Sequence, residues 1–133
     1  MEIPKHLKTY DLTSSTVWFN EEGILFSKPK PDAPVSPSNE EIKVDMDRLR
    51  GIIGNRKVCL VGESNPNSKP PKKEQRDYIA DEISSITKAM ALVASSPVSR
   101  MLANLFFSFK PPNYPIKMFS TEAEAVSWIR QYL

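Results

Sequence analysis

The amino-acid sequence predicts an α/β domain with a mixed sheet of about five strands and four helices. Two short β-type runs flank a glycine turn near the amino end, three apolar runs follow, and apolar residues recur at helical spacing between those runs. Strands that alternate with helices are parallel and joined by right-handed crossovers, so a hairpin followed by such strands makes the sheet mixed. One domain is expected over residues 1–133, with a mobile segment over 1–9.

The hairpin is predicted from STVWFNEEGILFSK, which covers Ser15–Lys28. Gly23 can supply the positive φ that a bulged hairpin turn needs. The following segment, Pro29–Ser38, carries four prolines and no regular period. It is therefore expected to be an extended surface linker within the domain.

The first helix is predicted to begin after Ser38, because Ser38 and Glu41 have the spacing of a capping box. Gly54 is a natural stop. The spacing leaves Asp45 and Asp47 on the exposed side of this helix. The side chains expected to face the core are Ile42, Met46, Leu49 and Ile53.

The rest of the chain alternates apolar runs with helices. KVCLV, at residues 57–61, AMALVA, at residues 89–94, and IKMF, at residues 116–119, are the predicted parallel strands. A helix is expected from near Lys72, and Pro97 suits the first turn of the next helix, capped by Ser95 or Ser96. Ser120 or Thr121 caps the last helix. In the helix from near Lys72, the residues expected to face inward are Ile79, Ile83 and Ile86. In the last helix they are Ala125, Val126, Ile129 and Leu133.

The helix after Pro97 is rich in apolar side chains. At about 100° per residue, one stripe collects most of them and is expected to be core: Val98, Met101, Leu102, Leu105, Phe106 and Phe109. Phe107 falls on the opposite side, near Ala103 and Arg100. These three residues predict a small apolar patch with a basic edge, which is either an interaction surface or the chance exposure of an aromatic ring.

Composition narrows the function classes. The formal net charge is +2 with both signs scattered, which does not indicate nucleic-acid binding. Cys59, the single cysteine, cannot form an intramolecular disulfide and is expected to be a small buried side chain. No run approaches the roughly 18 apolar residues that span a membrane, and the first residues lack the apolar core of a signal peptide. A cytoplasmic protein is expected.

Motifs for catalysis are not evident. His6 is the only histidine, which removes Ser-His-Asp and Cys-His arrangements and multi-histidine metal sites. Four carboxylates are expected near the loop end of the sheet, where open α/β folds bind ligands: Glu63, Asp77, Asp81 and Glu82. Their spacing shows no acid–base pair. The sequence therefore predicts no catalytic residue, cofactor or metal.

Three stretches, VWFNEEGILFSK, LVASSPVSRMLANLFF and YPIKMFSTEAEAVSWI, resemble a bacterial family of STAS-like proteins with the SpoIIAA-like fold, to which anti-sigma-factor antagonists belong. The resemblance covers residues 17–133. It implies a small regulatory or binding domain rather than an enzyme. Among relatives with this fold, some bind nucleotides and others are discussed as carriers of lipids or apolar ligands.

One motif of the family is missing. The phosphorylatable antagonists place a serine at the start of the helix after the central strand, in an Asp-Ser-Ser-Gly-like motif. Here that junction reads SNPNSKPPKKEQRDY, with Lys72 and Lys73 at the helix start. Ser64 and Ser68, which follow Glu63 in the loop, come a few residues early and are expected to be turn residues. The phosphorylation switch is therefore not expected.

Two functions remain from the sequence. The first is a non-enzymatic regulatory domain that acts through a protein partner or through self-association as a homodimer. The second is a carrier of an apolar or lipid-like ligand, which an internal cavity would favour. An enzyme using the carboxylates near Glu63 and Asp77, and a peripheral membrane contact through the Arg100–Phe107 helix, are further alternatives.

Overall fold

In a computed structural model of the chain, residues 1–67, 69, 71–94, 96–109 and 111–133 are described, with the side chains of Phe106 and Phe109 left out. These residues form an α/β domain, which confirms the predicted class. The strands are β1 (Thr9–Asp11), β2 (Ser15–Phe19), β3 (Leu25–Pro29), β4 (Val58–Glu63), β5 (Thr87–Val93) and β6 (Ile116–Phe119). The helices are α1 (Asn39–Ile53), α2 (Lys73–Ile86), α3 (Pro97–Phe109) and α4 (Glu122–Ile129), and a short 3-10 helix over Arg130–Tyr132 follows.

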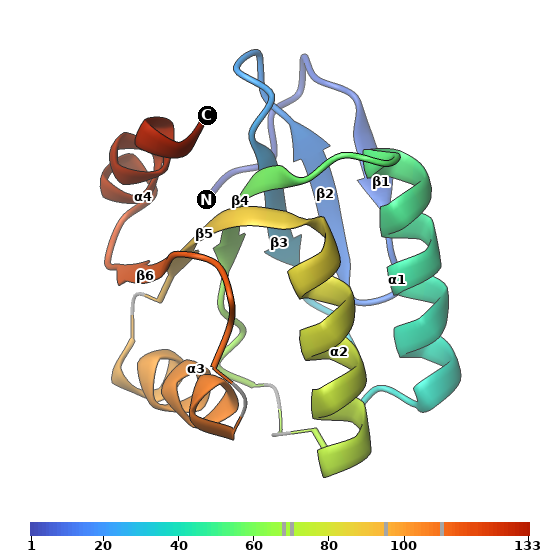
Figure 1. The fold of residues 1–133 in the computed structure, drawn as a ribbon. Coiled ribbons are helices and arrows are strands. Elements are labelled where there is room, and N and C mark those ends of the chain that lie inside the picture. The colour runs from blue at the N-terminus through green and yellow to red at the C-terminus, as the bar shows by residue number, and fades with distance from the viewer. Residues whose placement is uncertain (68, 70, 95, 110) are drawn as a thin grey trace.

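The strands form one mixed sheet in the order β1-β2-β3-β4-β5-β6 (Figure 1). β1, β2 and β3 pair antiparallel, whereas β3 to β6 pair parallel. Gly23 has a φ of 82° in the turn between β2 and β3, as the hairpin requires. The prediction of about five strands missed β1, because its three residues, TYD, are too few to show an alternating pattern.

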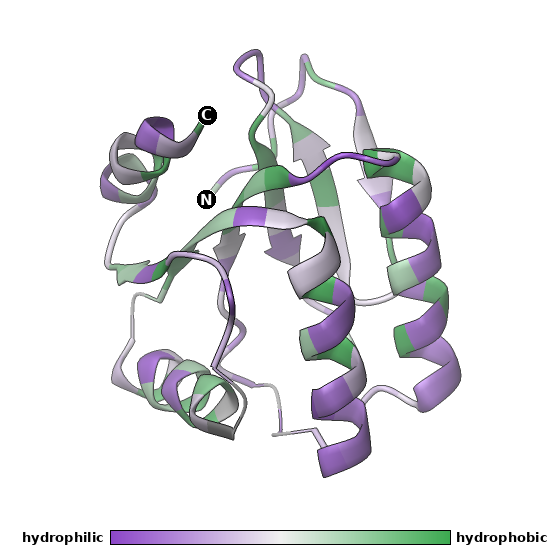
Figure 2. Ribbon diagram, in the orientation of Figure 1, coloured by the Kyte–Doolittle hydropathy of each residue, from purple (hydrophilic) through white to green (hydrophobic). Residues whose placement is uncertain are grey.

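Two hydrophobic clusters lie on opposite faces of the sheet. On one face, Leu49 of α1 and Ile86 of α2 pack with Leu25, Leu60 and Met90 of the strands. On the other face, the side chains that pack together include Trp18, Phe26, Val61, Ala91, and Ala125 and Ile129 of α4. Figure 2 shows apolar residues concentrated in the strands, with hydrophilic residues over much of α1 and α2. The sheet is therefore covered on both faces, as its continuous apolar runs predict.

The predicted helix ends are mostly confirmed. Ser38 and Glu41 form the capping box of α1, and Gly54, with a φ of 79°, ends that helix. Ser96 Oγ accepts a hydrogen bond from the amide of Ser99 at 3.1 Å, which caps α3; the alternative cap, Ser95, lies outside the described residues. Thr121 caps α4. Leu133, expected to face inward, is 52% exposed because it lies beyond the end of α4.

The segment before β1 contacts the rest of the domain. Residues 1–8 have neither helix nor strand. The side chains of Met1 and Leu7 pack against the cluster that includes α4, and the amino group of Met1 lies 3.5 Å from Glu63 Oε2. The mobility expected for residues 1–9 stays a prediction, but the structure gives this segment a packing site.

Helix α3 packs with a face other than the predicted one. Met101 is 60% exposed and Leu105 is 40% exposed, whereas Ala103 is only 6% exposed and Ser99 is buried. The side chains of Phe106 and Phe109, also assigned to the inward stripe, lie outside the described part of the structure. The inward face carries small residues, so the helix approaches the loop after β4 closely: Ser64 Oγ lies 3.5 Å from the carbonyl oxygen of Ser99. Periodicity located the largest apolar stripe, but packing uses the side with small residues.

Candidate functional site: a cavity between the sheet and two helices

Two small residues lie side by side in the sheet, next to a row of large ones. Ser27 of β3 is paired with Gly62 of β4, and Gly62 with Leu92 of β5. The neighbouring row on the same face consists of large side chains, namely Leu25, Leu60 and Met90. Because side chains alternate between faces along a strand, Ser27 and Gly62 leave the space above them unfilled on the face that α1 and α2 cover.

That space is a cavity of about 390 Å³. Its side walls include Ile42 and Met46 of α1, Ile79 and Ile83 of α2, and Phe107 of α3. A Cβ atom added at Gly62 would have a single heavy atom within 4 Å, Leu92 Cδ1 at 3.7 Å. The floor therefore has room for a larger side chain at residue 62, and most of the wall is aliphatic.

A buried carboxylate also lines the cavity. Asp45, on α1, is 6% exposed, which corrects the expectation that it faces solvent. Its oxygens accept hydrogen bonds from the backbone amides of Thr13 at 2.6 Å and Ser14 at 3.2 Å. The turn before β2 folds over α1, and its amides donate to the carboxylate, so helical periodicity alone could not show this burial.

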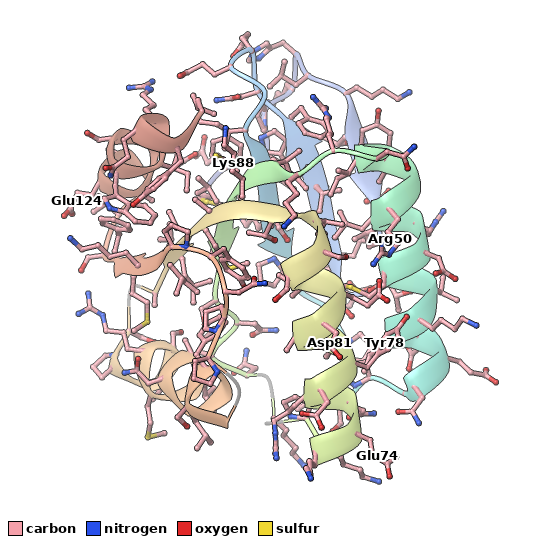
Figure 3. The ribbon with its side chains drawn as sticks, in the orientation of Figure 1. Arg50, Glu74, Tyr78, Asp81, Lys88 and Glu124 are labelled. Carbon is pink, nitrogen blue, oxygen red and sulfur yellow. The ribbon has the colours of Figure 1, made fainter. Side chains whose placement is uncertain are left out.

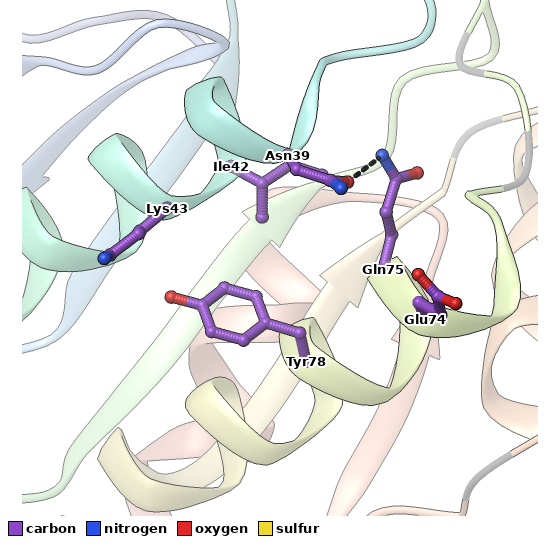
Figure 4. A pocket seen from close by; sticks show the side chains of 6 residues that line it. All are labelled: Asn39, Ile42, Lys43, Glu74, Gln75 and Tyr78. Carbon is purple, nitrogen blue, oxygen red and sulfur yellow. Dashed lines mark hydrogen bonds between the residues drawn. The ribbon is translucent and has the colours of Figure 1, made fainter.

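A groove on the outer surface lies between the first turns of α1 and α2. It has a volume of about 250 Å³ and is lined by Asn39, Ile42, Lys43, Glu74, Gln75 and Tyr78 (Figure 4). Gln75 Nε2 donates to Asn39 Oδ1 at 2.8 Å and to the carbonyl oxygen of Pro37 at 3.3 Å. These hydrogen bonds connect the first turn of α2 to the start of α1. Ile42 lines both this groove and the inner cavity.

A second surface pocket adjoins the cavity at its other side. It measures about 180 Å³ and lies between α2, the end of α3 and residues 111–114. Phe107 and Ile83 line both this pocket and the inner cavity. Burial raises the pKa of Tyr114, which lines the outer pocket, to about 12. Phe107 therefore lies on the boundary between the interior and the surface.

The predicted patch on α3 is not arranged as expected. Arg100 is exposed, and it donates hydrogen bonds to the carbonyl oxygen of Ala94 at 3.1 Å and to Ser120 Oγ. Ala103 is buried, and Phe107 is half-buried against the cluster that includes α1 and α2. The exposed apolar side chains of this helix include Val98, Met101 and Leu105 instead.

Of the predicted loop residues, Glu63 lines the cavity, but its carboxylate contacts the amino-terminal segment. The Glu63 carboxylate contacts the Met1 amino group, and the amide of Ser64 donates to the carbonyl oxygen of Val93 at 2.9 Å. Ser68 lies outside the described residues. Strand alternation directs the Glu63 side chain to the opposite face from that of Gly62, where Met1 packs against the cluster that includes α4.

The carboxylates of α2 have other surroundings. Arg50 of α1 faces α2 (Figure 3), and its guanidinium donates to Glu82 Oε2 and to Ser85 Oγ. Asp81 lines the outer pocket beside Tyr114, and Asp77 is half-buried on the same helix. Glu82 is thus part of a contact between two helices, whereas Glu63 contacts Met1, so these two carboxylates are not brought together.

Among the described residues, no group of three or more His, Cys, Asp or Glu side chains is placed to hold a metal ion. Cys59 is buried, and burial raises the pKa of its thiol. No helix within the described residues is long and apolar enough to cross a membrane.

The sheet order and its covering helices define the class of α/β domains with a SpoIIAA-like fold. The chain is similar to a crystal structure of an uncharacterized protein of the DUF3478 family with this fold, from Shewanella loihica PV-4. The TM-score is 0.60 and the identity 11%, over 92% of this chain and 98% of that chain. A protein with unknown function from Arthrobacter sp. FB24 matches with a TM-score of 0.31 and 19% identity, over 86% of this chain and 92% of that chain.

The chain belongs to the family described as Domain of unknown function (DUF7793), whose model matches residues 17–133. No curated protein sequence matches it. The resemblance to STAS-like domains is thus confirmed for the fold, while the link to anti-sigma-factor antagonists stays a prediction.

Proposed function

We propose that this chain is a non-enzymatic binding domain that holds an apolar small molecule in the cavity between the sheet and helices α1 and α2. The cavity of about 390 Å³ carries the proposal. Its volume lies in the range of about 300–1,000 Å³ that small-molecule sites occupy, and such sites are mostly apolar with a few polar groups. Of the two functions expected from the sequence, the geometry favours the carrier of an apolar or lipid-like ligand.

Packing physics supports a functional reason for this space. Protein interiors are close-packed, and voids larger than a water molecule are few in a domain. An unfilled apolar cavity destabilises a fold in proportion to its volume, and such cavities stay dry and accept apolar guests. A Cβ atom at position 62 would have only Leu92 Cδ1 within 4 Å. The small residues Ser27 and Gly62 therefore keep open a volume that larger side chains could fill.

The proposal is tested with N-phenyl-1-naphthylamine, a neutral probe that fluoresces strongly in apolar sites. We expect saturable binding of one probe per chain. The variant Gly62→Val should weaken binding at least tenfold, because its side chain occupies the cavity floor. Met101→Ser, which removes an apolar side chain that is 60% exposed on α3, is the matched control and should leave binding unchanged. Absence of binding, or loss of binding in Met101→Ser alone, would overturn the proposal.

A regulatory domain that acts in the cytoplasm through protein contacts is the second candidate function. It is favoured by the outward stripe on α3, where Val98, Met101 and Leu105 are 49%, 60% and 40% exposed. Residues spaced by three and four positions share one face of a helix. The occupant we propose for this face is a second copy of the chain, because a two-fold contact is the commonest way to cover such a face.

Sedimentation velocity tests this second candidate. The parent protein should sediment as a dimer at micromolar concentration, and Met101→Glu should sediment as a monomer with an unchanged thermal melt. Lys43→Glu, a charge change in the groove between α1 and α2, is the control and should remain dimeric. A parent protein that stays monomeric at all concentrations contradicts self-association through α3.

A further inference from the structure

The polar side chains that line the cavity come from one half of the domain. Strands β2 and β3, the turn before β2 and helix α1 supply Ser14, Ser15, Ser27 and Asp45. The other half, built from β4, β5, α2 and α3, supplies mainly apolar side chains: Leu60, Ile79, Ile83, Ile86, Met90, Leu92 and Phe107. The first half also supplies apolar lining residues, among them Val17, Leu25 and Met46. Because β2 and β3 precede β4 and β5 in the sheet order, the few polar groups lie toward one side of a lining that is otherwise apolar.

Glu63 is the exception in the apolar half, but its carboxylate is directed elsewhere. Glu63 follows Gly62 on β4, so alternation places its side chain on the opposite face of the sheet. There its Oε2 atom lies 3.5 Å from the amino group of Met1, and Met1 packs on the cluster that includes α4. The carboxylate that determines the charge of the cavity wall is therefore that of Asp45.

Asp45 has acceptor capacity beyond the bonds it makes. Its two oxygens accept one backbone amide each, from Thr13 and Ser14, and an ionised carboxylate offers about four acceptor positions. A group that donates hydrogen bonds would meet these remaining positions and the hydroxyl groups of Ser15 and Ser27. An anionic head group would instead meet the negative charge of Asp45, which is only 6% exposed. Two like charges in contact away from water are strongly unfavourable.

The volume sets the size of the ligand. A cavity of about 150 Å³ holds one benzene molecule, so about 390 Å³ holds roughly 15 non-hydrogen atoms by the same ratio. A straight chain of about twelve carbons with a small head group matches this size. Phe107 and Ile83, which reach the outer pocket, lie at the apolar side, where the end of such a chain would lie.

We propose that the ligand is a medium-chain amphiphile whose head group donates hydrogen bonds, an alcohol or an amine, and that Asp45 selects it against fatty carboxylates. This inference rests on the proposed function, because it assigns the head group of a molecule bound in that same cavity. It adds the orientation of the ligand: the head group lies between α1 and strands β2 and β3, and the chain extends under α2.

Competition against the bound N-phenyl-1-naphthylamine tests the inference. The competitors at pH 7 are 1-dodecanol, below its solubility limit, and dodecylamine and dodecanoate, each below its micelle concentration. We expect the alcohol and the amine to displace the probe at concentrations at least tenfold lower than dodecanoate does. Equal or stronger displacement by dodecanoate would overturn the inference, and so would failure of all three to displace a probe that binds. Failure of the probe itself to bind would instead overturn the proposed function.

The variant Asp45→Asn separates charge from shape. Asparagine keeps an acceptor oxygen for the amide of Thr13 and removes the negative charge, so the disadvantage of dodecanoate should shrink to threefold or less. Met101→Ser, on the outer side of α3, should keep the ranking of the parent protein. A full tenfold disadvantage in a folded Asp45→Asn protein, checked by circular dichroism, would show that Asp45 does not select the head group. The ranking in the parent protein decides the ligand class without any variant.

Discussion

At Ser27 and Gly62 the sheet lacks the large side chains of the neighbouring row, and this difference of two residues opens the cavity. Asp45 lies at the same space, with its carboxylate held by the amides of Thr13 and Ser14. The sequence does not reveal this arrangement, because Ser27 and Gly62 meet only through the register of β3 with β4. Residues that are 35 positions apart in the chain therefore determine one site, and a local pattern contains no signal for it.

Alanine variants of Leu105 and Leu49 test whether Leu105 lies on the outer face of α3, as the structure places it. Leu105 is 40% exposed, so Leu105→Ala should lower the free energy of unfolding by less than about 1 kcal/mol. Leu49 of α1 is 8% exposed, so the matched variant Leu49→Ala should cost about 2–5 kcal/mol. Urea unfolding measures both. A cost for Leu105→Ala as large as that for Leu49→Ala would restore the stripe predicted from periodicity.

Tyr114 is expected to lower the stability of the fold at alkaline pH. Burial raises its pKa to about 12, above the value of about 10 for an unfolded chain. The neutral phenol is favoured in the fold, so its contribution to stability is complete below pH 10 and is lost as the pH rises toward 12. Urea midpoints between pH 8 and 11.5 should therefore fall less steeply for Tyr114→Phe than for the parent. Parallel curves would mean that Tyr114 titrates in the fold as in the unfolded chain.

At the scale of elements, the hairpin, the helices and the parallel strands were predictable, because each has a local signal. Ser38 and Glu41 mark the start of α1, and Gly54 marks its end. Helix α3 shows where a local signal fails. Most of its positions are apolar, so its periodicity indicates a helix without fixing the buried side. Ser99 and Ala103 are buried, and Ser99 contacts Ser64 in the loop after β4; sequence spacing cannot describe that tertiary contact.

The position of α3 assigns a role in ligand exchange to Phe107. It lines both the inner cavity and the outer pocket, so Phe107→Ala should open a connection between them. Stopped-flow fluorescence with N-phenyl-1-naphthylamine should show association and dissociation rate constants that both rise several-fold, with a smaller change in the equilibrium constant. Leu105→Ala, on the outer side of α3, is the control. An unchanged dissociation rate constant in Phe107→Ala would exclude exchange along this route.

At the scale of the whole molecule, the sheet separates two environments. The face under α4 is filled by large side chains such as Trp18 and Phe26, whose rings stack at 5.6 Å. The face under α1 and α2 carries the cavity. The sequence predicts that both faces are buried, but it does not show how completely each is filled. The filling of each face depends on the distance at which the helices pack against the sheet.

The central claim is that an apolar molecule binds between the sheet and helices α1 and α2, and ¹³C-methyl NMR with N-phenyl-1-naphthylamine tests it most directly. Binding in the cavity predicts intermolecular nuclear Overhauser effects from the aromatic protons of the probe to the methyl groups of Leu60, Ile83 and Met90, which line the cavity. Nuclear Overhauser effects confined to Val98, Met101 and Leu105, which are exposed on α3, would place the probe on the surface and contradict the claim.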